Sequence, residues 1–240
     1  ASGLRSGGIK TVAKTTGTSP RIIDEFGVDK YIHRLRSASI GEQISLIRHF
    51  SKIKPDALVI ECMAVNPQYQ WISEHKIVKS TIGVMTNVRP DHLDEMGISI
   101  DQITKSMSNT IPFNGILVTA EGKQSSILKS IASERMSEFY KTSVNNIDNK
   151  DISNFEYLEH KENISLALEV CKLCGVDKSI ALKGMSKCTP DPGALTIWKM
   201  QFNKNVFEFI NAFAANDPAS TLKTWELVNE RLNREKFAIF

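Results

Sequence analysis

The chain has 240 residues, of which 41% are hydrophobic and 24% are charged. This size and composition are typical of a globular protein with one large domain or one and a half smaller ones. A net charge of +3, without a run of five Lys or Arg residues, argues against a nucleic-acid partner. No stretch approaches the roughly 18 consecutive apolar residues of a membrane span, and residues 1–14 lack the apolar core of a signal peptide.

The four cysteines, Cys62, Cys171, Cys174 and Cys188, are sparse, which favours a reduced, cytoplasmic setting. Cys171 and Cys174 have CxxC spacing, but they lie in a helical stretch without a preceding strand or a second CxxC motif. We therefore favour two half-buried helix cysteines, with a metal or redox pair as the alternative.

Strand-like and helical segments alternate along the chain, which predicts an α/β sheet with crossover helices. After a helix tail at Ala1–Arg5, the expected strands are Ile9–Ala13, Asp56–Cys62, Thr81–Thr86 and Gly115–Ala120. The expected helices are Ser39–Ile53, Ile100–Met107, Ser125–Met136 and Asn163–Leu173. The polar stretch Asn145–Asn154 is expected to be a loop.

A second unit is expected to begin near Pro190, because residues 188–193 have the Pro and Gly density of a boundary. We place one domain at residues 1–189 and another at residues 190–240. The second contains strand-like runs at Ala194–Met200 and Asn205–Ile210 with a tight turn at Phe202–Lys204, a helix at Asp217–Leu232 with Pro in its first turn, and an apolar strand at Phe237–Phe240. Both ends are expected to continue in a longer protein.

The densest group of ionisable residues follows the expected strand Thr81–Thr86. Asp91, His92, Asp94 and Glu95 stand at the carboxyl end of that strand, where open α/β sheets bind ligands. Three acids around one imidazole are unfavourable unless a cation or a substrate amine is close. As an alternative, Asp91 is the N-cap of a short helix over His92–Met96.

Glu61 ends a second apolar strand, as the penultimate residue of Asp56–Cys62. If this strand and Thr81–Thr86 are neighbours, the Glu61 carboxylate and the His92 imidazole point into one crevice. The two side chains could then bind a hard divalent ion whose other ligands are water and phosphate oxygens. Otherwise Glu61 is an ordinary surface acid.

The sequence TNVRPDHLDEMG at residues 86–97 resembles the TNxxxDHLDxxG signature of the Mur-ligase superfamily, which includes the folylpolyglutamate synthases. The segment DALVIE resembles the family strand that ends in a magnesium-binding glutamate. Further family elements are matched in order at residues 7–18, 160–168, 189–193 and 211–220. Within the superfamily, Arg89-Pro90 and residues 190–193 and 215–218 resemble the poly-γ-glutamate synthases of capsule polymer systems.

The resemblance implies a Mur-ligase central domain, with a largely parallel sheet flanked by helices, followed by the beginning of a Rossmann-like C-terminal domain. It also implies a reaction in which ATP phosphorylates a γ-carboxylate and an amine displaces the phosphate to form an amide. Glu61 and His92 would hold Mg²⁺, while Asp91 and Asp94 would orient the imidazole or the water ligands. A carbamylated Lys105 would serve a second Mg²⁺, with an exposed helix lysine as the alternative.

For ATP, the resemblance implies that Asn163 contacts adenine, that Thr16 lies in a cofactor-binding turn, and that Asn216 and Asp217 approach from the C-terminal domain. The implied substrate is glutamate or a γ-glutamyl polymer, and membrane subunits of a capsule synthase at the inner face of the membrane are candidate partners. A folate or peptidoglycan-precursor ligase, and a non-catalytic binding module with the same fold, are the alternatives.

Two departures from the family pattern bear on these expectations. No GxxxxGK[ST] phosphate loop occurs in the 240 residues, and about fifty residues after Pro190 are fewer than a complete C-terminal domain needs. We therefore expect a fragment of a longer ligase, which by itself binds ATP poorly and turns over little.

Overall fold

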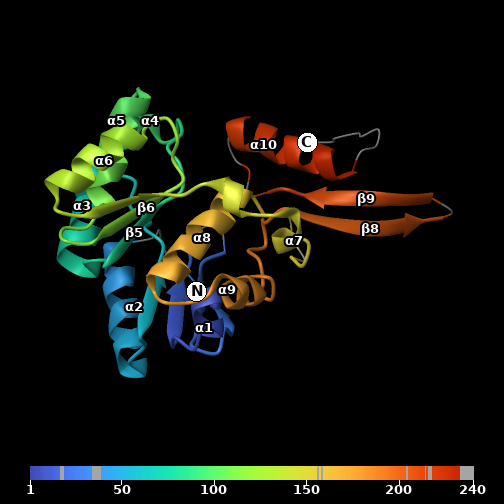
Figure 1. The fold of residues 1–240 in the computed structure, drawn as a ribbon, viewed down its shortest axis with the longest axis horizontal. Helices are drawn as coiled ribbons and strands as arrows, with labels where there is room; N and C mark the ends of the chain where they lie inside the picture. Colours follow the sequence, from blue (N-terminus) through green and yellow to red (C-terminus); the bar gives the residue numbers. More distant parts are fainter. Residues whose placement is uncertain are drawn as a thin grey trace.

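The computed structural model describes residues 1–16, 19–33, 39–155, 157, 159–203, 205–213, 215 and 218–232. Within these residues, β-sheets are covered by helices on both faces, and a long hairpin extends to one side (Figure 1). This arrangement confirms the predicted α/β class. No helix of the described residues is both long enough and apolar enough to cross a membrane.

The first sheet contains four strands in the order β3-β2-β1-β4. Its members are β1 (Thr11–Lys14), β2 (Arg21–Ile23), β3 (Asp29–Tyr31) and β4 (Ala57–Ile60). β1 and β4 are parallel, with Ala13 opposite Val59, whereas β1 pairs antiparallel with β2 and β2 pairs antiparallel with β3. The predicted strands at Ile9–Ala13 and Asp56–Cys62 are present with shorter bounds, and the two antiparallel strands were not predicted.

The second sheet is fully parallel and has the order β5-β6-β7. Its strands are β5 (Ile82–Met85), β6 (Ile116–Thr119) and β7 (Glu138–Lys141), of which the first two were predicted. The apolar composition of β5 and β6 suits parallel strands that are covered on both faces. Leu117 and Val118 point to opposite faces of β6, and both are almost completely buried.

Helices form the layers on either side. The main ones are α2 (Ile40–Ile53), α5 (Ile100–Met107), α6 (Ser125–Glu134), α8 (Lys161–Leu173) and α9 (Lys178–Met185), and the shorter ones are α1 (Ser2–Ser6), α3 (Pro67–Ile72), α4 (Leu93–Met96) and α7 (Asn149–Ile152). A π-helix covers Ser73–Val78, and 3₁₀ turns cover Ser108–Thr110 and Val144–Asn146. The predicted loop at Asn145–Asn154 is therefore wrong, because Asp148 and Asp151 form a reciprocal capping box that starts α7.

Three buried clusters join these layers. One lies among α1, α8 and α9 and includes Leu4, Ile164 and Ala181. The second joins β5 and β6 to α5 and α6, and the third packs Val12 of β1 against Leu46 and Phe50 of α2. The strand ends are thus held by cores on both faces of the sheets, which leaves the loops at their carboxyl ends to form a cleft.

The segment after residue 190 forms an antiparallel hairpin followed by a helix. β8 (Thr196–Phe202) pairs with β9 (Asn205–Asn211), and Trp198 stacks on Phe209 with ring centroids 5.6 Å apart. α10 covers Pro218–Leu232, with proline at its first position as predicted. The expected strand at Phe237–Phe240 lies outside the described residues, and the domain boundary and a Rossmann-like continuation stay predictions.

Candidate functional site

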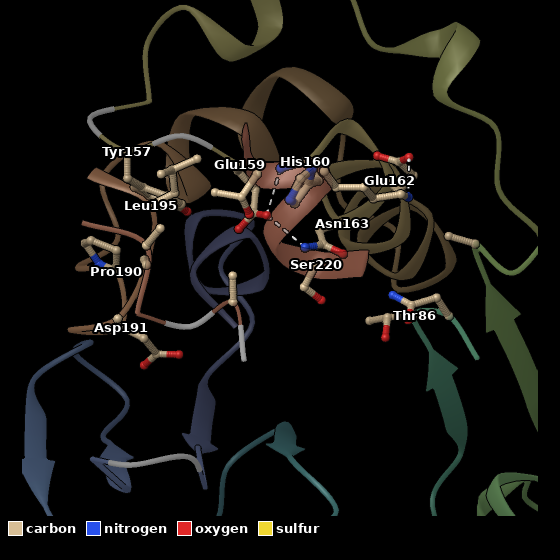
Figure 2. Close-up of a pocket in the computed structure, with 18 of the residues that line it drawn as sticks. Thr86, Tyr157, Glu159, His160, Glu162, Asn163, Pro190, Asp191, Leu195 and Ser220 are labelled. Carbon is tan, nitrogen blue, oxygen red and sulfur yellow. Dashed lines mark hydrogen bonds and ion pairs between the residues drawn. The ribbon is translucent and has the colours of Figure 1, made fainter. Parts of the chain in front are cut away.

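A cleft of about 810 Å³ opens at the carboxyl ends of β1, β5 and β6 (Figure 2). The N-terminal end of α8, the linker after α9, and α10 form its other walls. Its charged lining residues are four cations, Arg21, Arg89, Lys123 and Lys223, and four acids, Glu121, Glu159, Glu162 and Asp191, and His160 lines it as well. The formal charges of these cations and acids cancel, so the cations can contact anionic groups of a ligand locally, at separate places in the cleft.

The loop after β5 forms one wall through residues 86–89 and is held in place by Glu121. Glu121 is only 6% exposed, and its Oε2 accepts the Val88 N–H at 2.7 Å. Its Oε1 accepts the N–H groups of Lys123 at 2.7 Å and Gln124 at 3.1 Å, next to the start of α6. One buried carboxylate therefore ties the β5 loop to the turn after β6.

These hydrogen bonds set the ionisation of Glu121. Burial raises the pKa of the carboxyl. The hydrogen bonds from the backbone N–H groups of Val88, Gln124, Lys123 and Gly122 lower it by more than burial raises it, so the pKa lies below its ordinary value. Glu121 stands just after a buried strand, in the same kind of position as Glu61. That position was the signal by which the sequence could have singled it out, although we did not predict a role for Glu121.

Asp91, His92 and Asp94 lie beyond the anchored part of this loop, and all three are exposed. His92 has a left-handed backbone with φ 46°, unusual for a residue other than glycine, and its ring Nε2 lies 3.7 Å from Asp91 Oδ2. The Asp91 Oδ1 accepts the N–H of His92 at 2.9 Å. The helix-cap alternative for Asp91 is wrong, because α4 begins at Leu93 and its N-cap residue is His92.

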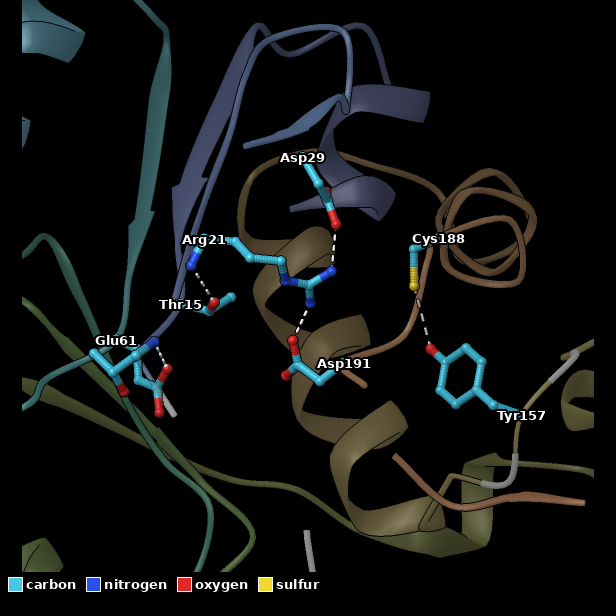
Figure 3. A network of polar contacts seen from close by, with 8 residues as sticks. Thr15, Arg21, Asp29, Glu61, Tyr157, Cys188 and Asp191 are labelled. Atoms are coloured by element: carbon cyan, nitrogen blue, oxygen red, sulfur yellow. Dashed lines mark hydrogen bonds and ion pairs between the residues drawn. The ribbon is translucent and has the colours of Figure 1, made fainter. Parts of the chain in front are cut away.

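Glu61 follows β4 and is bound to the loop after β1. Its Oε2 accepts the Thr16 N–H at 2.6 Å (Figure 3). Neither Glu61 nor His92 is part of the cleft lining, although Thr15 and Arg89, which are close to Thr16 and His92 in the chain, are. β4 and β5 belong to separate hydrogen-bonded sheets, so the shared metal site of Glu61 and His92 stays a prediction.

The N-terminal end of α8 supplies another wall of the cleft. Glu159 Oε1 accepts hydrogen bonds from the Asn163 side chain at 2.8 Å and from the His160 N–H at 2.9 Å. Glu159, His160 and Asn163 all line the cleft, as Figure 2 shows. The structure thus brings Asn163 to the cleft, while its contact with adenine stays a prediction.

The linker and α10 close the remaining side. Arg89 donates a hydrogen bond to Ser220 Oγ, and Lys223 lies 3.7 Å from Glu162. Asn216 and Asp217 lie outside the described residues, although Ala215 and Ser220 on either side of them line the cleft. The buried Arg21 guanidinium pairs with Asp29 and with Asp191 of the linker, and no pattern in the sequence indicated this buried cation.

Three further predicted residues lie away from the cleft wall. Lys105 is exposed in the last turn of α5 and does not line the cleft. Cys171 is buried in the cluster of α1, α8 and α9, while Cys174 is exposed where α8 ends. Both thiols are free, and the described residues contain no group of three or more His, Cys, Asp or Glu side chains that could hold a metal ion.

Comparison with curated proteins finds two capsule proteins among the relatives. The chain is 39% identical over 223 residues to the capsule biosynthesis protein CapB of Bacillus anthracis, which covers 92% of this chain and 48% of that protein. It is also 39% identical over 229 residues to PGA synthase CapB of Bacillus subtilis (strain 168), which covers 95% of this chain and 58% of that protein. The chain therefore spans about half the length of the curated relatives it matches.

Solved structures with the same fold include folylpolyglutamate synthases. A bifunctional folylpolyglutamate synthase/dihydrofolate synthase with Mn, AMPPNP and L-glutamate bound has a TM-score of 0.68 at 14% identity, over 97% of this chain and 63% of that one. The S73A mutant of L. casei FPGS has a TM-score of 0.65 at 13% identity, over 97% of this chain and 68% of that one. At these identities the similarity shows that the proteins share a fold, and nothing more.

Family models match two successive parts of the chain. The model for the poly-gamma-glutamate synthase CapB C-terminal domain matches residues 197–240, which contain β8 except for its first residue, β9 and α10. The Mur ligase middle domain matches residues 11–186, which contain both larger sheets and most of the covering helices. Because that match takes in well over half of the sequence, the chain belongs to the Mur ligase family.

Proposed function

We propose that the complete gene product is an ATP-dependent ligase that joins glutamate through its γ-carboxylate, as in poly-γ-glutamate capsule synthesis. The observation that carries this proposal is the match of residues 197–240 to the CapB C-terminal domain, next to a Mur ligase middle domain. The 39% identity to two capsule proteins supports the same substrate class. The proposed setting is the cytoplasm, beside the membrane subunits of a capsule synthase.

The lining of the cleft supports a reaction between two anions. A γ-carboxylate must approach the γ-phosphate of ATP, and their mutual repulsion has to be offset by cations. Arg89, Lys123 and Lys223 line the cleft and supply positive charge from three different segments, whereas Arg21 is already paired with Asp29 and Asp191. The γ-carboxylate oxygen can then attack the γ-phosphorus of ATP, which breaks its bond to the β,γ-bridging oxygen, releases ADP and gives an acyl phosphate. An incoming amine attacks the acyl carbon, loses a proton and displaces inorganic phosphate, which gives the amide.

The residues predicted to hold a divalent cation have suitable chemistry. Glu61 offers a carboxylate that the Thr16 N–H orients, and the exposed His92 ring offers a nitrogen. In this proposal Asp91 keeps His92 in its left-handed conformation by accepting the His92 N–H. A bound Mg²⁺ would supply further charge neutralisation for the triphosphate. Asn163, on the cleft wall, is proposed to contact the adenine of ATP.

The test uses the complete gene product and measures ATP hydrolysis with L-glutamate, D-glutamate and a γ-linked glutamyl oligomer. We expect Mg²⁺-dependent hydrolysis that at least one glutamyl substrate stimulates, together with formation of an amide product. Glu61→Gln and His92→Ala should each lower kcat by at least about 100-fold, as expected for groups that act on transition-state charge. The matched control Asp101→Asn removes an exposed acid from α5 and should retain activity.

The alternatives predict other outcomes of the same assay. A folylpolyglutamate synthase would require a folate acceptor, and a peptidoglycan-precursor ligase would require a nucleotide-linked acceptor. A non-catalytic module would hydrolyse no ATP with any of these compounds. Glutamate-independent hydrolysis, or unchanged kcat in both Glu61→Gln and His92→Ala, would refute the proposal.

A further inference from the structure

Arg21 places a buried cation at the wall of the cleft. Its side chain is only 4% exposed, yet the residue belongs to the cleft lining. The guanidinium pairs with two carboxylates, Asp29 and Asp191 (Figure 3). Its buried Nε has no hydrogen-bond partner among the described residues, so the guanidinium retains a donor. Such a site has the planar donor geometry that recognises carboxylates.

The two carboxylates around Arg21 are held very differently. Asp29 lies on β3, which pairs directly with β2, where Arg21 is located, and its side chain is 22% exposed. Asp191 comes from the linker, 170 residues away in sequence, and its side chain is 60% exposed. Asp29 is therefore part of the sheet, whereas Asp191 can leave Arg21 without disturbing a strand. A carboxylate from solution could take its place.

The proposed substrate carries a suitable group. In a γ-linked glutamyl chain the γ-carboxylates are used in amide bonds, so each residue keeps a free α-carboxylate. We propose that Arg21 binds an α-carboxylate of the γ-glutamyl substrate and that Asp191 occupies this position until the substrate displaces it. This inference rests on the proposed function and deepens it by naming how the substrate is recognised. The exchange of one carboxylate for another leaves the charge around Arg21 unchanged, so no buried charge is left unpaired.

The position of Arg21 suits this role. The backbone N–H of Arg21 donates to Thr15 Oγ1 at 3.1 Å. Thr16, which follows Thr15 in the chain, donates its backbone N–H to Glu61 Oε2 at 2.6 Å. The carboxylate site and the predicted metal ligand Glu61 are thus attached to adjacent residues of one loop (Figure 3). A substrate bound through an α-carboxylate at Arg21 would have the rest of its chain directed along the same cleft.

Binding measured by calorimetry without ATP tests the inference. The probe is a γ-linked glutamyl trimer, in its L and D forms, and the matched ligand is the same trimer with every α-carboxylate converted to an amide. Asp191→Asn keeps the shape of the side chain and removes the competing charge, so it should lower the Kd of the trimer by about tenfold. Arg21→Lys, which keeps the charge and loses the planar fork, should raise that Kd by at least about tenfold.

The amidated trimer should bind weakly to the wild-type protein, and its Kd should be the same for the Asp191→Asn variant. Asp101→Asn removes an exposed acid elsewhere and should leave the Kd of both trimers unchanged. An unchanged or raised Kd of the acidic trimer in Asp191→Asn would overturn the inference, and so would equal binding of the two trimers. The Asp191→Asn measurement and the comparison of the two trimers on the wild-type protein do not depend on whether Arg21→Lys folds.

The two proposals fail in different ways. If the complete gene product ligates glutamate but Asp191→Asn and amidation have no effect, the α-carboxylate inference is wrong and the ligase proposal stands. If the trimer binds as expected but ATP is not hydrolysed, Arg21 still recognises carboxylates and the ligase proposal is wrong.

Discussion

Two loops at the carboxyl edge of the same parallel sheet differ in whether their acidic side chains are buried or exposed. The turn after β6 buries Glu121 and directs backbone N–H groups at both of its oxygens. The loop after β5 leaves Asp91, His92 and Asp94 exposed to solvent. The buried acid thus determines where the loop lies, whereas the exposed side chains remain available for a ligand. The exposed ionisable residues of the β5 loop therefore depend for their position on Glu121, which the sequence motif did not include.

The strongest test of this comparison removes the buried anchor. Glu121→Ala leaves the N–H groups of Val88, Lys123 and Gln124 without their charged acceptor, and Val88 is buried, Gln124 half-buried and Lys123 exposed. Each unsatisfied buried donor is unfavourable, so we expect the free energy of unfolding to fall by about 3 kcal/mol. Urea unfolding followed by circular dichroism measures this value.

The control for that measurement is an acid of the other loop. Glu95 is exposed and accepts a hydrogen bond from the Asn66 side chain at 2.9 Å. Glu95→Ala should reduce the free energy of unfolding by less than about 1 kcal/mol, because water can replace the carboxylate. Equal losses in Glu121→Ala and Glu95→Ala would show that the two loops do not differ in the proposed way.

A smaller effect is expected from the residue that joins β6 to both loops. Thr119 Oγ1 donates to the Met85 carbonyl at 2.8 Å and accepts the Glu121 N–H at 3.0 Å. Thr119→Val has nearly the same shape but lacks both hydrogen bonds. We expect a loss of about 1–2 kcal/mol in urea unfolding. Thr142→Val is a suitable control, because among the described residues the Thr142 side chain makes one long hydrogen bond, from Oγ1 to the Thr119 carbonyl at 3.4 Å.

The fold could be predicted largely because buried parallel strands have a simple pattern. The runs at residues 57–60, 82–85 and 116–119 are apolar and short, and each was predicted within one or two residues. The strands β2 and β3 were missed because their three residues each are too few to show a period. The π-helix at Ser73–Val78 was missed because local sequence gives little indication of an i→i+5 pattern.

The candidate site was only partly predictable for a related reason. Asp91, His92 and Glu61 stand in a dense motif or at a strand end, so their sequence positions drew attention. Arg21 and Asp191 are 170 residues apart, and nothing local to either one indicates that they pair. Contacts of this kind depend on how the linker returns to the first sheet, which is a property of the tertiary structure.

The pH dependence of stability distinguishes the buried Glu121 from the exposed acids of the β5 loop. Because the pKa of Glu121 is lower in the folded protein than in the unfolded chain, its carboxylate stabilises the fold above the unfolded pKa, and this contribution is lost as the pH falls through the folded pKa. Glu121→Gln cannot ionise, so its free energy of unfolding should change less with pH below about pH 4.5 than that of the wild type. Parallel curves of the two proteins in urea unfolding at pH 3 to 6 would contradict this assignment.

The smallest effect on stability is expected for an exposed residue that follows β5. Asp94 is exposed in the short helix α4, and Asp94→Asn replaces it with a side chain of nearly the same shape. Surface substitutions of this kind change the free energy of unfolding by less than about 0.5 kcal/mol. If Asp94 also orients the ligands of a metal at His92, the same variant should raise the Mg²⁺ concentration needed for half-maximal ATP hydrolysis by about tenfold or more. An unchanged Mg²⁺ requirement with unchanged stability would remove Asp94 from the proposed metal site and leave His92 and Asp91 as its candidate groups on the β5 loop, beside the cleft-lining Arg89.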